Sequence, residues 1–138
     1  MALIMKRFGF TKKERITGEK RIEALFAQGA SFMSYPFRVV YLETAQNGAM
    51  PLSILISIPK KRIKSAVDRN RMKRLAREAY RLNKHLFLYR ESAENGHLDV
   101  AFICVADKQC DYATVEKGMR KAMGELNHRI EENSAENN

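Results

Sequence analysis

The side chains of this sequence best suited to chemistry are cations, and most of them are gathered in one segment. Between Lys60 and Arg90, twelve lysine and arginine residues stand against two acidic residues, whereas the net charge of the whole chain is +9. The rest of the chain is therefore close to neutral. Ordinary protein surfaces mix both signs of charge, so this local excess predicts a binding site for a polyanion.

Helical periodicity arranges these cations along one side of a helix. The helix is predicted to begin at Ser65, because Ser65 and Asp68 fit a capping residue followed three positions later by an acid. At about 100° per residue, one side of the helix is apolar and carries Met72, Leu75, Ala76, Ala79 and Leu86. Asn83 is the one polar residue on this side. The opposite side, called the basic stripe below, carries Asn70, Lys73, Arg74, Arg77, Arg81 and Lys84, flanked by Arg69 and Arg71.

The composition of the basic stripe favours nucleic acid as the polyanion. Like charges at these spacings repel, and an external polyanion offsets that cost. The planar fork of arginine pairs with phosphate, whereas a helix on a membrane surface would need for lipid the apolar side that here belongs to a core. Two readings compete with a specific RNA partner, namely a generic RNA-binding or ribosome-assembly module and a DNA-binding regulator. A DNA regulator would place a second helix shortly before the reading helix, where this sequence predicts a strand.

The remaining elements predict an α+β domain around this helix. A first helix is expected from Thr17 as N-cap to Gly29, with Ile22, Leu25 and Phe26 on one side. Residues 37–42 and 52–58 read as an antiparallel strand pair joined by a turn at 46–51, and residues 98–106 read as a later buried strand. The helical segment between the strands implies a βαβ-like crossover. A last helix is expected from Asp111, with an apolar side made of Val115, Met119, Ala122, Met123, Leu126 and Ile130.

Nothing in the sequence predicts an active site on the protein itself. Three histidines, His85, His97 and His128, show no ligand spacing, and Cys104 and Cys110 are expected to be free thiols buried in a reducing compartment. No apolar run reaches the roughly 20 residues of a membrane span, and the N-terminal stretch does not fit a signal peptide. We therefore expect a cytoplasmic protein with no membrane partner. The tail at 131–138 is expected to be disordered.

At residues 60–81 the sequence resembles the signature of the bacterial ribonuclease P protein family. The matching features are a Lys-Lys start, an Ala-Val pair, the Arg-Asn-Arg core at 69–71, and then Lys-Arg and Arg-Glu pairs. Arg15-Ile and the stretch from Leu25 to Ser31 resemble the family's first helix and turn. The resemblance covers residues 10–130 and leaves 1–9 as a flexible N-terminal segment. Lys64 and Asp68 depart from it, since glycine and an apolar residue are usual there.

The resemblance implies a fold, partners and a division of labour. The fold would be a single-domain α-β-β-β-α-β-α sandwich, similar to the second domain of a small-subunit ribosomal protein, with a left-handed crossover. The RNA subunit would carry out the Mg²⁺-dependent hydrolysis that removes the 5′ leader of precursor tRNA, with no cofactor bound by the protein alone and no catalytic residue on it. Leader contacts would fall on Phe26 and Phe37. Contacts to the catalytic RNA would come from Lys61, Arg62, Arg69, Asn70, Arg71, Lys73, Arg74, Arg77 and Arg81.

Overall fold

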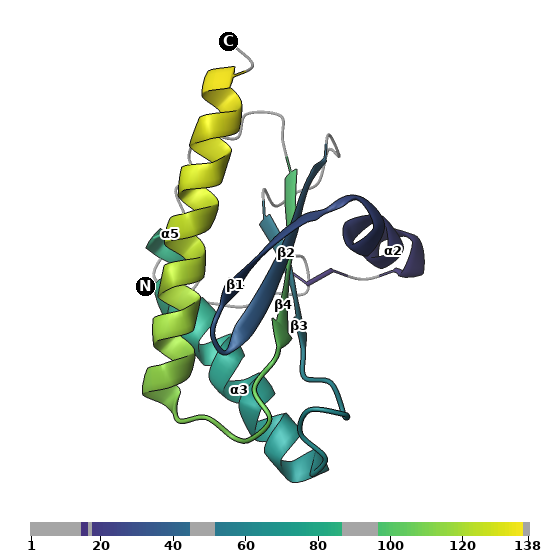
Figure 1. Cartoon of the computed structure of the whole chain (residues 1–138), viewed down its shortest axis with the longest axis vertical. Coiled ribbons are helices and arrows are strands. Elements are labelled where there is room, and N and C mark those ends of the chain that lie inside the picture. Colours follow the sequence, from purple (N-terminus) through teal and green to yellow (C-terminus); the bar gives the residue numbers. More distant parts are fainter. Residues whose placement is uncertain (1–14, 17, 45–51, 87–96, 137–138) are drawn as a thin grey trace, which may run out of the picture.

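A computed structural model describes residues 15–16, 18–44, 52–86 and 97–136. Their elements follow the order expected from the family resemblance, a mixed α+β arrangement of three α-helices and a four-stranded sheet, with one added turn of 3₁₀-helix (Figure 1). In chain order they are α2 (Glu19–Gln28), β1 (Ala30–Ser34), β2 (Phe37–Thr44), β3 (Leu52–Ser57), α3 (Ala66–Asn83), η2 (Lys84–Leu86), β4 (His97–Cys104) and α5 (Tyr112–Glu136).

The strands lie in the order β1-β2-β4-β3, so the predicted pairing of β2 with β3 is wrong. β4 lies between them, antiparallel to β2 and parallel to β3. The physical reason is the burial of β4, whose residues are all buried except the half-buried Ile103. Such continuous burial requires neighbours on both edges and both faces, which only a central strand has. The predicted crossover is present, because α3 connects the parallel neighbours β3 and β4. The predicted turn at 46–51 lies outside the described residues.

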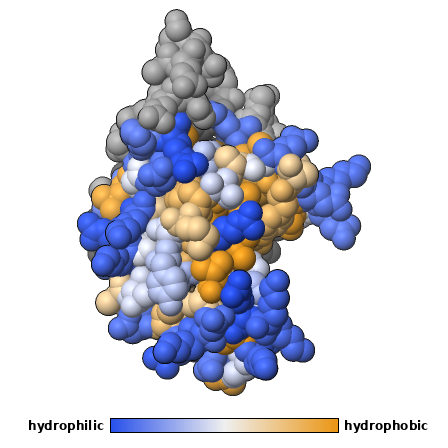
Figure 2. Space-filling model, in the orientation of Figure 1, coloured by the Kyte–Doolittle hydropathy of each residue, from blue (hydrophilic) through white to orange (hydrophobic). Residues whose placement is uncertain are grey.

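The two faces of the sheet bury clusters of different size. The larger cluster lies under α3 and α5 and includes Phe37, Val39 and Phe102 of the sheet. The smaller cluster, of Ile16, Leu25, Val40 and Ala101, lies under α2 on the other face. Figure 1 shows α3 and α5 on one side of the sheet and α2 alone on the other. Figure 2 shows the outline of the molecule indented below α2, and on this face of the sheet Leu42, Leu55 and Ile103 are only half-buried.

The predicted caps of the two long helices are confirmed. The Oγ of Ser65 accepts a hydrogen bond from the backbone N–H of Asp68 at 3.3 Å, and Oδ1 of Asp111 accepts one from Thr114 at 2.9 Å. The predicted apolar side of α5 is buried from Val115 to Ile130. α5 continues to Glu136, so the expectation of disorder is wrong for residues 131–136. The boundaries 1–9 and 10–130, the left-handed crossover and the ribosomal-protein similarity stay predictions.

α2 is capped by glycines at both ends. Its N-cap is Gly18, with a φ of 95°, which is one residue later than the predicted Thr17. Thr17 itself lies outside the described residues. Gly29 ends the helix as predicted, but its φ of −72° is ordinary. Glycine is required there by a close approach, because a Cβ would lie 2.4 Å from the carbonyl oxygen of Leu25 and 2.8 Å from that of Tyr41.

Candidate nucleic-acid interface

The basic stripe is exposed along most of α3. On the inner side of this helix Met72, Ala76 and Ala79 are fully buried. On the outer side four polar side chains are exposed and, among the described residues, make no hydrogen bond or ion pair: Asn70, Arg71, Arg74 and Arg77. Lys73 is half-buried at the margin of the stripe. The helix therefore presents unpaired guanidinium groups to solvent over successive turns, as phosphate binding requires.

The flanking cations are partly engaged within the protein. The Nη1 of Arg69 donates to the carbonyl oxygens of Ile63, at 3.0 Å, and Lys64, at 2.7 Å, which ties the start of α3 to the preceding loop. Arg81 forms an ion pair with Glu78 one turn earlier. In the same loop Lys61 is exposed, while Arg62 pairs with Asp107 at 3.2 Å. Because Arg62, Asp107, Arg81 and Glu78 are all substantially exposed, these pairs are weak and allow an exchange of partners.

Lys84 does not belong to the basic stripe, contrary to the prediction. α3 ends at Asn83, and Lys84 begins η2 and is fully buried. Helical periodicity holds only within α3, so a count carried past the end of the helix misplaces this residue. The apparent misfit Asn83 is buried as well and connects α3 to α5. Its Nδ2 donates to the carbonyl oxygen of Ala79 at 2.8 Å and to Oε2 of Glu116 at 3.3 Å.

The two predicted leader-contacting aromatic residues lie in opposite environments. Phe26 on α2 is 47% exposed, so its ring is accessible to a stacking base. Phe37 is fully buried and meets Phe102 edge to face, with ring centroids 5.8 Å apart. A ring closed in the main core cannot stack on a nucleotide, so the structure removes Phe37 from the candidate leader contacts. The alternation of β2 explains the error, since residue 37 faces α3 and α5 while Arg38 and Val40 face the side of α2.

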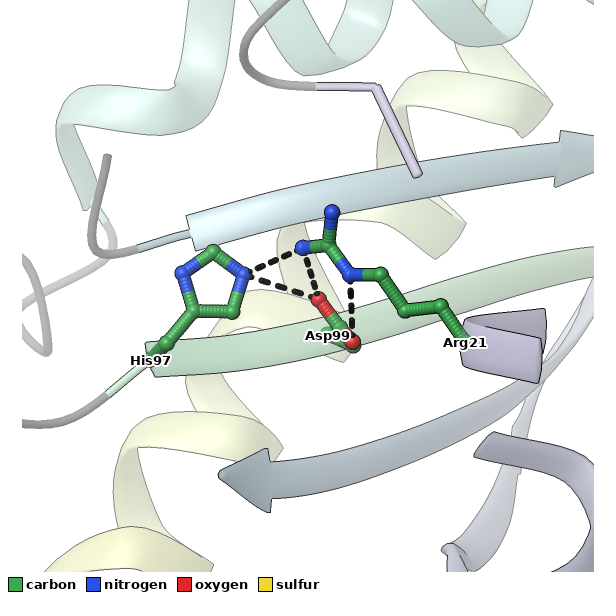
Figure 3. Close-up of polar contacts among 3 residues, drawn as sticks. All are labelled: Arg21, His97 and Asp99. Carbon is green, nitrogen blue, oxygen red and sulfur yellow. Dashed lines mark hydrogen bonds and ion pairs between the residues drawn. The ribbon is translucent and has the colours of Figure 1, made fainter. Parts of the chain in front are cut away.

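A buried polar cluster, not predicted from the sequence, joins α2 to the sheet. Arg21 reaches from α2 and makes two hydrogen bonds to the Asp99 carboxylate on β4, Nε to Oδ2 at 3.1 Å and Nη2 to Oδ1 at 2.6 Å (Figure 3). The His97 Nε2 lies 2.8 Å from Oδ1 of Asp99 and 2.6 Å from Nη2 of Arg21. This one nitrogen either donates to Asp99 or accepts from Arg21. Asp99 and His97 are almost fully buried, so the cluster fixes α2 to the sheet by a desolvated ion pair.

The histidines and cysteines of the described residues form no metal-binding cluster. His85 and His128 are exposed, and no group of three or more His, Cys, Asp or Glu side chains in the described ranges is arranged to hold a metal ion. Cys104 is buried, which raises the pKa of its thiol, and Cys110 is half-buried rather than buried as expected. No helix in the described parts of the chain is long and apolar enough to cross a membrane.

The fold and this surface define an α+β nucleic-acid-binding protein with an exposed arginine helix. Comparison with known proteins identifies its family: the Ribonuclease P family model matches residues 10–127, and the chain belongs to this family. It is thus a protein subunit of ribonuclease P, associates with the RNA of that enzyme and forms part of an endoribonuclease holoenzyme in tRNA processing.

Relatives of similar length support this assignment. The ribonuclease P protein component of Porphyromonas gingivalis is 43% identical over 84% of this chain and 85% of its own length. That of Chlorobium phaeobacteroides is 31% identical over 86% of each chain. Among solved structures, the ribonuclease P protein of Staphylococcus aureus superposes with a TM-score of 0.64 at 20% identity, covering 82% of this chain and 94% of its own. That of Thermotoga maritima gives 0.62 at 23% identity, covering 80% and 94%. These two structures support the fold.

Proposed function

We propose that this subunit binds the catalytic RNA through the basic stripe and binds the 5′ leader of precursor tRNA beside α2, promoting removal of the leader. The observation that carries this proposal is the exposed side of α3. There Arg71, Arg74 and Arg77 are accessible and, in the described chain, unpaired. Three arginines on one helix face, with no acidic partner in the part of the chain that the structure describes, offer charge-assisted hydrogen bonds to successive phosphates.

In this proposal the protein contributes affinity rather than a reacting group. Hydrolysis and its Mg²⁺ ions are assigned to the RNA subunit, as the family resemblance implies. Phosphate contacts made by arginines release counterions, and this release supplies much of the binding free energy at low salt. The subunit would therefore be most needed where Mg²⁺ is too scarce to screen the RNA phosphates.

The leader site is proposed for the sheet face that α2 covers only in part. Phe26 is exposed on α2. Met33 and Arg38 are cross-strand partners, and the strand alternation directs both toward this face, where both are exposed. An exposed ring on α2 and an exposed arginine on the sheet face that α2 covers fit sequence-tolerant binding of a single strand, in which bases stack on the ring and phosphates contact the arginine.

Reconstitution with a bacterial ribonuclease P RNA tests the main proposal. At low Mg²⁺ the chain should raise cleavage of precursor tRNA, and the double variant Arg71→Ala/Arg74→Ala should lose most of this gain. Arg120→Ala, which removes an exposed arginine from α5, is the matched control and should behave as wild type. A generic RNA-binding module would bind the RNA without raising cleavage, and that result would contradict the proposal.

The leader site has a separate test, the ratio of precursor to mature tRNA affinity in the reconstituted complex. Phe26→Ala should weaken precursor binding by about 1 to 3 kcal/mol, the usual contribution of one stacked base, and leave mature tRNA unaffected. Phe37→Ala is the contrasting variant, since loss of a fully buried ring should lower stability by about 3 to 5 kcal/mol and affect both affinities together. An unchanged ratio of precursor to mature tRNA affinity in folded Phe26→Ala would show that the leader does not bind at Phe26.

A further inference from the structure

We propose that the surface between β1 and α5 holds a second site for RNA, which takes a short single-stranded segment. It is separate from the basic stripe, and Met33 of its lining also borders the sheet face under α2. β1 is an edge strand, and α5 runs beside it on the side of the sheet away from α2 (Figure 1). A pocket of about 720 Å³ opens between these elements, and its lining combines aromatic rings with charges: Phe32, Tyr35, Lys117, Lys121, Glu125 and Arg129.

Two of the pocket's cations have no partner of opposite charge among the described residues. Lys117 and Lys121 lie four positions apart on α5 and are exposed, and neither makes a hydrogen bond or ion pair with any described residue. Glu125, the carboxylate in the lining, forms an ion pair with Arg129. The Nε of Arg129 lies 2.7 Å from Oε1 of Glu125. Like charges at this helical spacing repel by a few tenths of a kcal/mol. A phosphate between the two lysines would remove that repulsion.

The aromatic part of the pocket is accessible for stacking. Tyr35 follows the end of β1 and is 59% exposed. The ring of Phe32 is already covered by the guanidinium of Arg129, 4.8 Å from the ring centroid, so Tyr35 is the platform left open. An exposed ring beside unpaired cations is typical of single-strand binding, in which the ring stacks on a base and the cations hold phosphates. An acidic peptide would satisfy the lysines but would bring no planar group to Tyr35, so the chemistry favours RNA.

The two walls of the pocket are fixed relative to each other. The Ser34 Oγ donates a hydrogen bond to the carbonyl oxygen of Gly118 on α5 at 2.7 Å, and this contact is buried. Gly118 lets the chain after β1 lie directly against the helix, because a Cβ there would be 2.3 Å from the carbonyl oxygen of Tyr35. Since the walls are ordered before RNA arrives, binding loses little conformational entropy at this site.

An NMR titration of the full chain tests the proposal with a short oligouridylate, and in parallel with an oligoglutamate of equal length. The oligouridylate should cause saturable shifts of the backbone amides from Phe32 to Tyr35 and from Lys117 to Glu125. The double variant Lys117→Glu/Lys121→Glu should lose these shifts and keep those of the basic stripe. Lys108→Glu, the same charge change at an exposed residue before α5, is the control and should keep both sets.

The stacking role has its own variants. Tyr35→Ala should weaken the pocket's affinity about 5- to 150-fold, which corresponds to one stacked base, and Tyr35→Phe should retain it. Shifts confined to the basic stripe and α2, an equal response of the pocket to oligoglutamate, or full affinity in Tyr35→Ala would each overturn the proposal. These outcomes are independent of the precursor cleavage assay, because none of the altered residues belongs to α2 or α3.

Discussion

The ion pair between Arg21 and Asp99 leads to the sharpest prediction about stability. Arg21→Ala would leave the Asp99 carboxylate, whose side chain is only 2% exposed, with His97 as its remaining partner in the cluster. Removing one member of a buried ion pair typically costs about 3 to 5 kcal/mol, because the other charge stays desolvated and unpaired. The side chain of Arg21 is 24% exposed, so solvent already screens part of the interaction. We therefore expect a loss near about 3 kcal/mol, the lower end of that range.

Urea unfolding followed by far-UV circular dichroism measures this loss. Arg120→Ala, at an exposed arginine of α5, should change the free energy of unfolding by less than about 0.5 kcal/mol. Adding Asp99→Asn to Arg21→Ala should recover part of the stability, since the uncompensated charge is then gone. A loss below about 1 kcal/mol in Arg21→Ala, or strict additivity of the two substitutions, would refute the reasoning, because residues that share a buried pair must couple.

Three further predictions concern other parts of the molecule. If about six cations of α3 and its preceding loop contact phosphates, log K for the RNA subunit should fall with log salt at a slope of about −4 to −5, and a slope shallower than about −2 would contradict this. Gly118→Ala should lower the thermal midpoint, because the added methyl group meets the carbonyl oxygen of Tyr35; an unchanged midpoint would mean that the loop after β1 moves freely. Burial, aided by a hydrogen bond to Glu116, raises the pKa of Tyr112 from 10.0 to about 12. The stability linked to the neutral phenol is thus complete below pH 10.0 and lost as pH rises toward about 12, and unfolding midpoints across this window should fall less steeply in Tyr112→Phe.

Elements whose signals are local could be predicted from the sequence. The start of α3 at Ser65 and the start of α5 at Asp111 follow from capping chemistry, and both are confirmed by side-chain hydrogen bonds. The buried side of α3 could be predicted as well, because helical periodicity is also a local signal. Lys84 marks the limit of this reasoning, since the end of α3 at Asn83 is not visible in the pattern.

Features that depend on which distant segments meet could not be predicted in this way. The neighbours 37–42 and 52–58 were expected to pair, but β4 is more apolar and takes the central position between them. The cluster of Arg21 and Asp99 joins residues 78 positions apart, and neither residue belongs to a motif. The lysines of the β1–α5 pocket could not be predicted as a site either. Outside residues 60–90 the basic and acidic residues nearly cancel, so the net charge there gives no sign of a local basic surface.

The central position of β4 has a consequence for how the chain folds during synthesis. β2 and β3 are joined in the sheet through β4, a strand that leaves the ribosome after both of them and after α3. Until residues 97–104 emerge, each of these strands has an unpaired edge, and the apolar side of α3 has no completed sheet to cover. Native pairings between segments far apart in sequence slow folding and prolong the exposure of such edges. The arginine-rich segment of α3 therefore leaves the ribosome before the strand that completes the sheet beneath it.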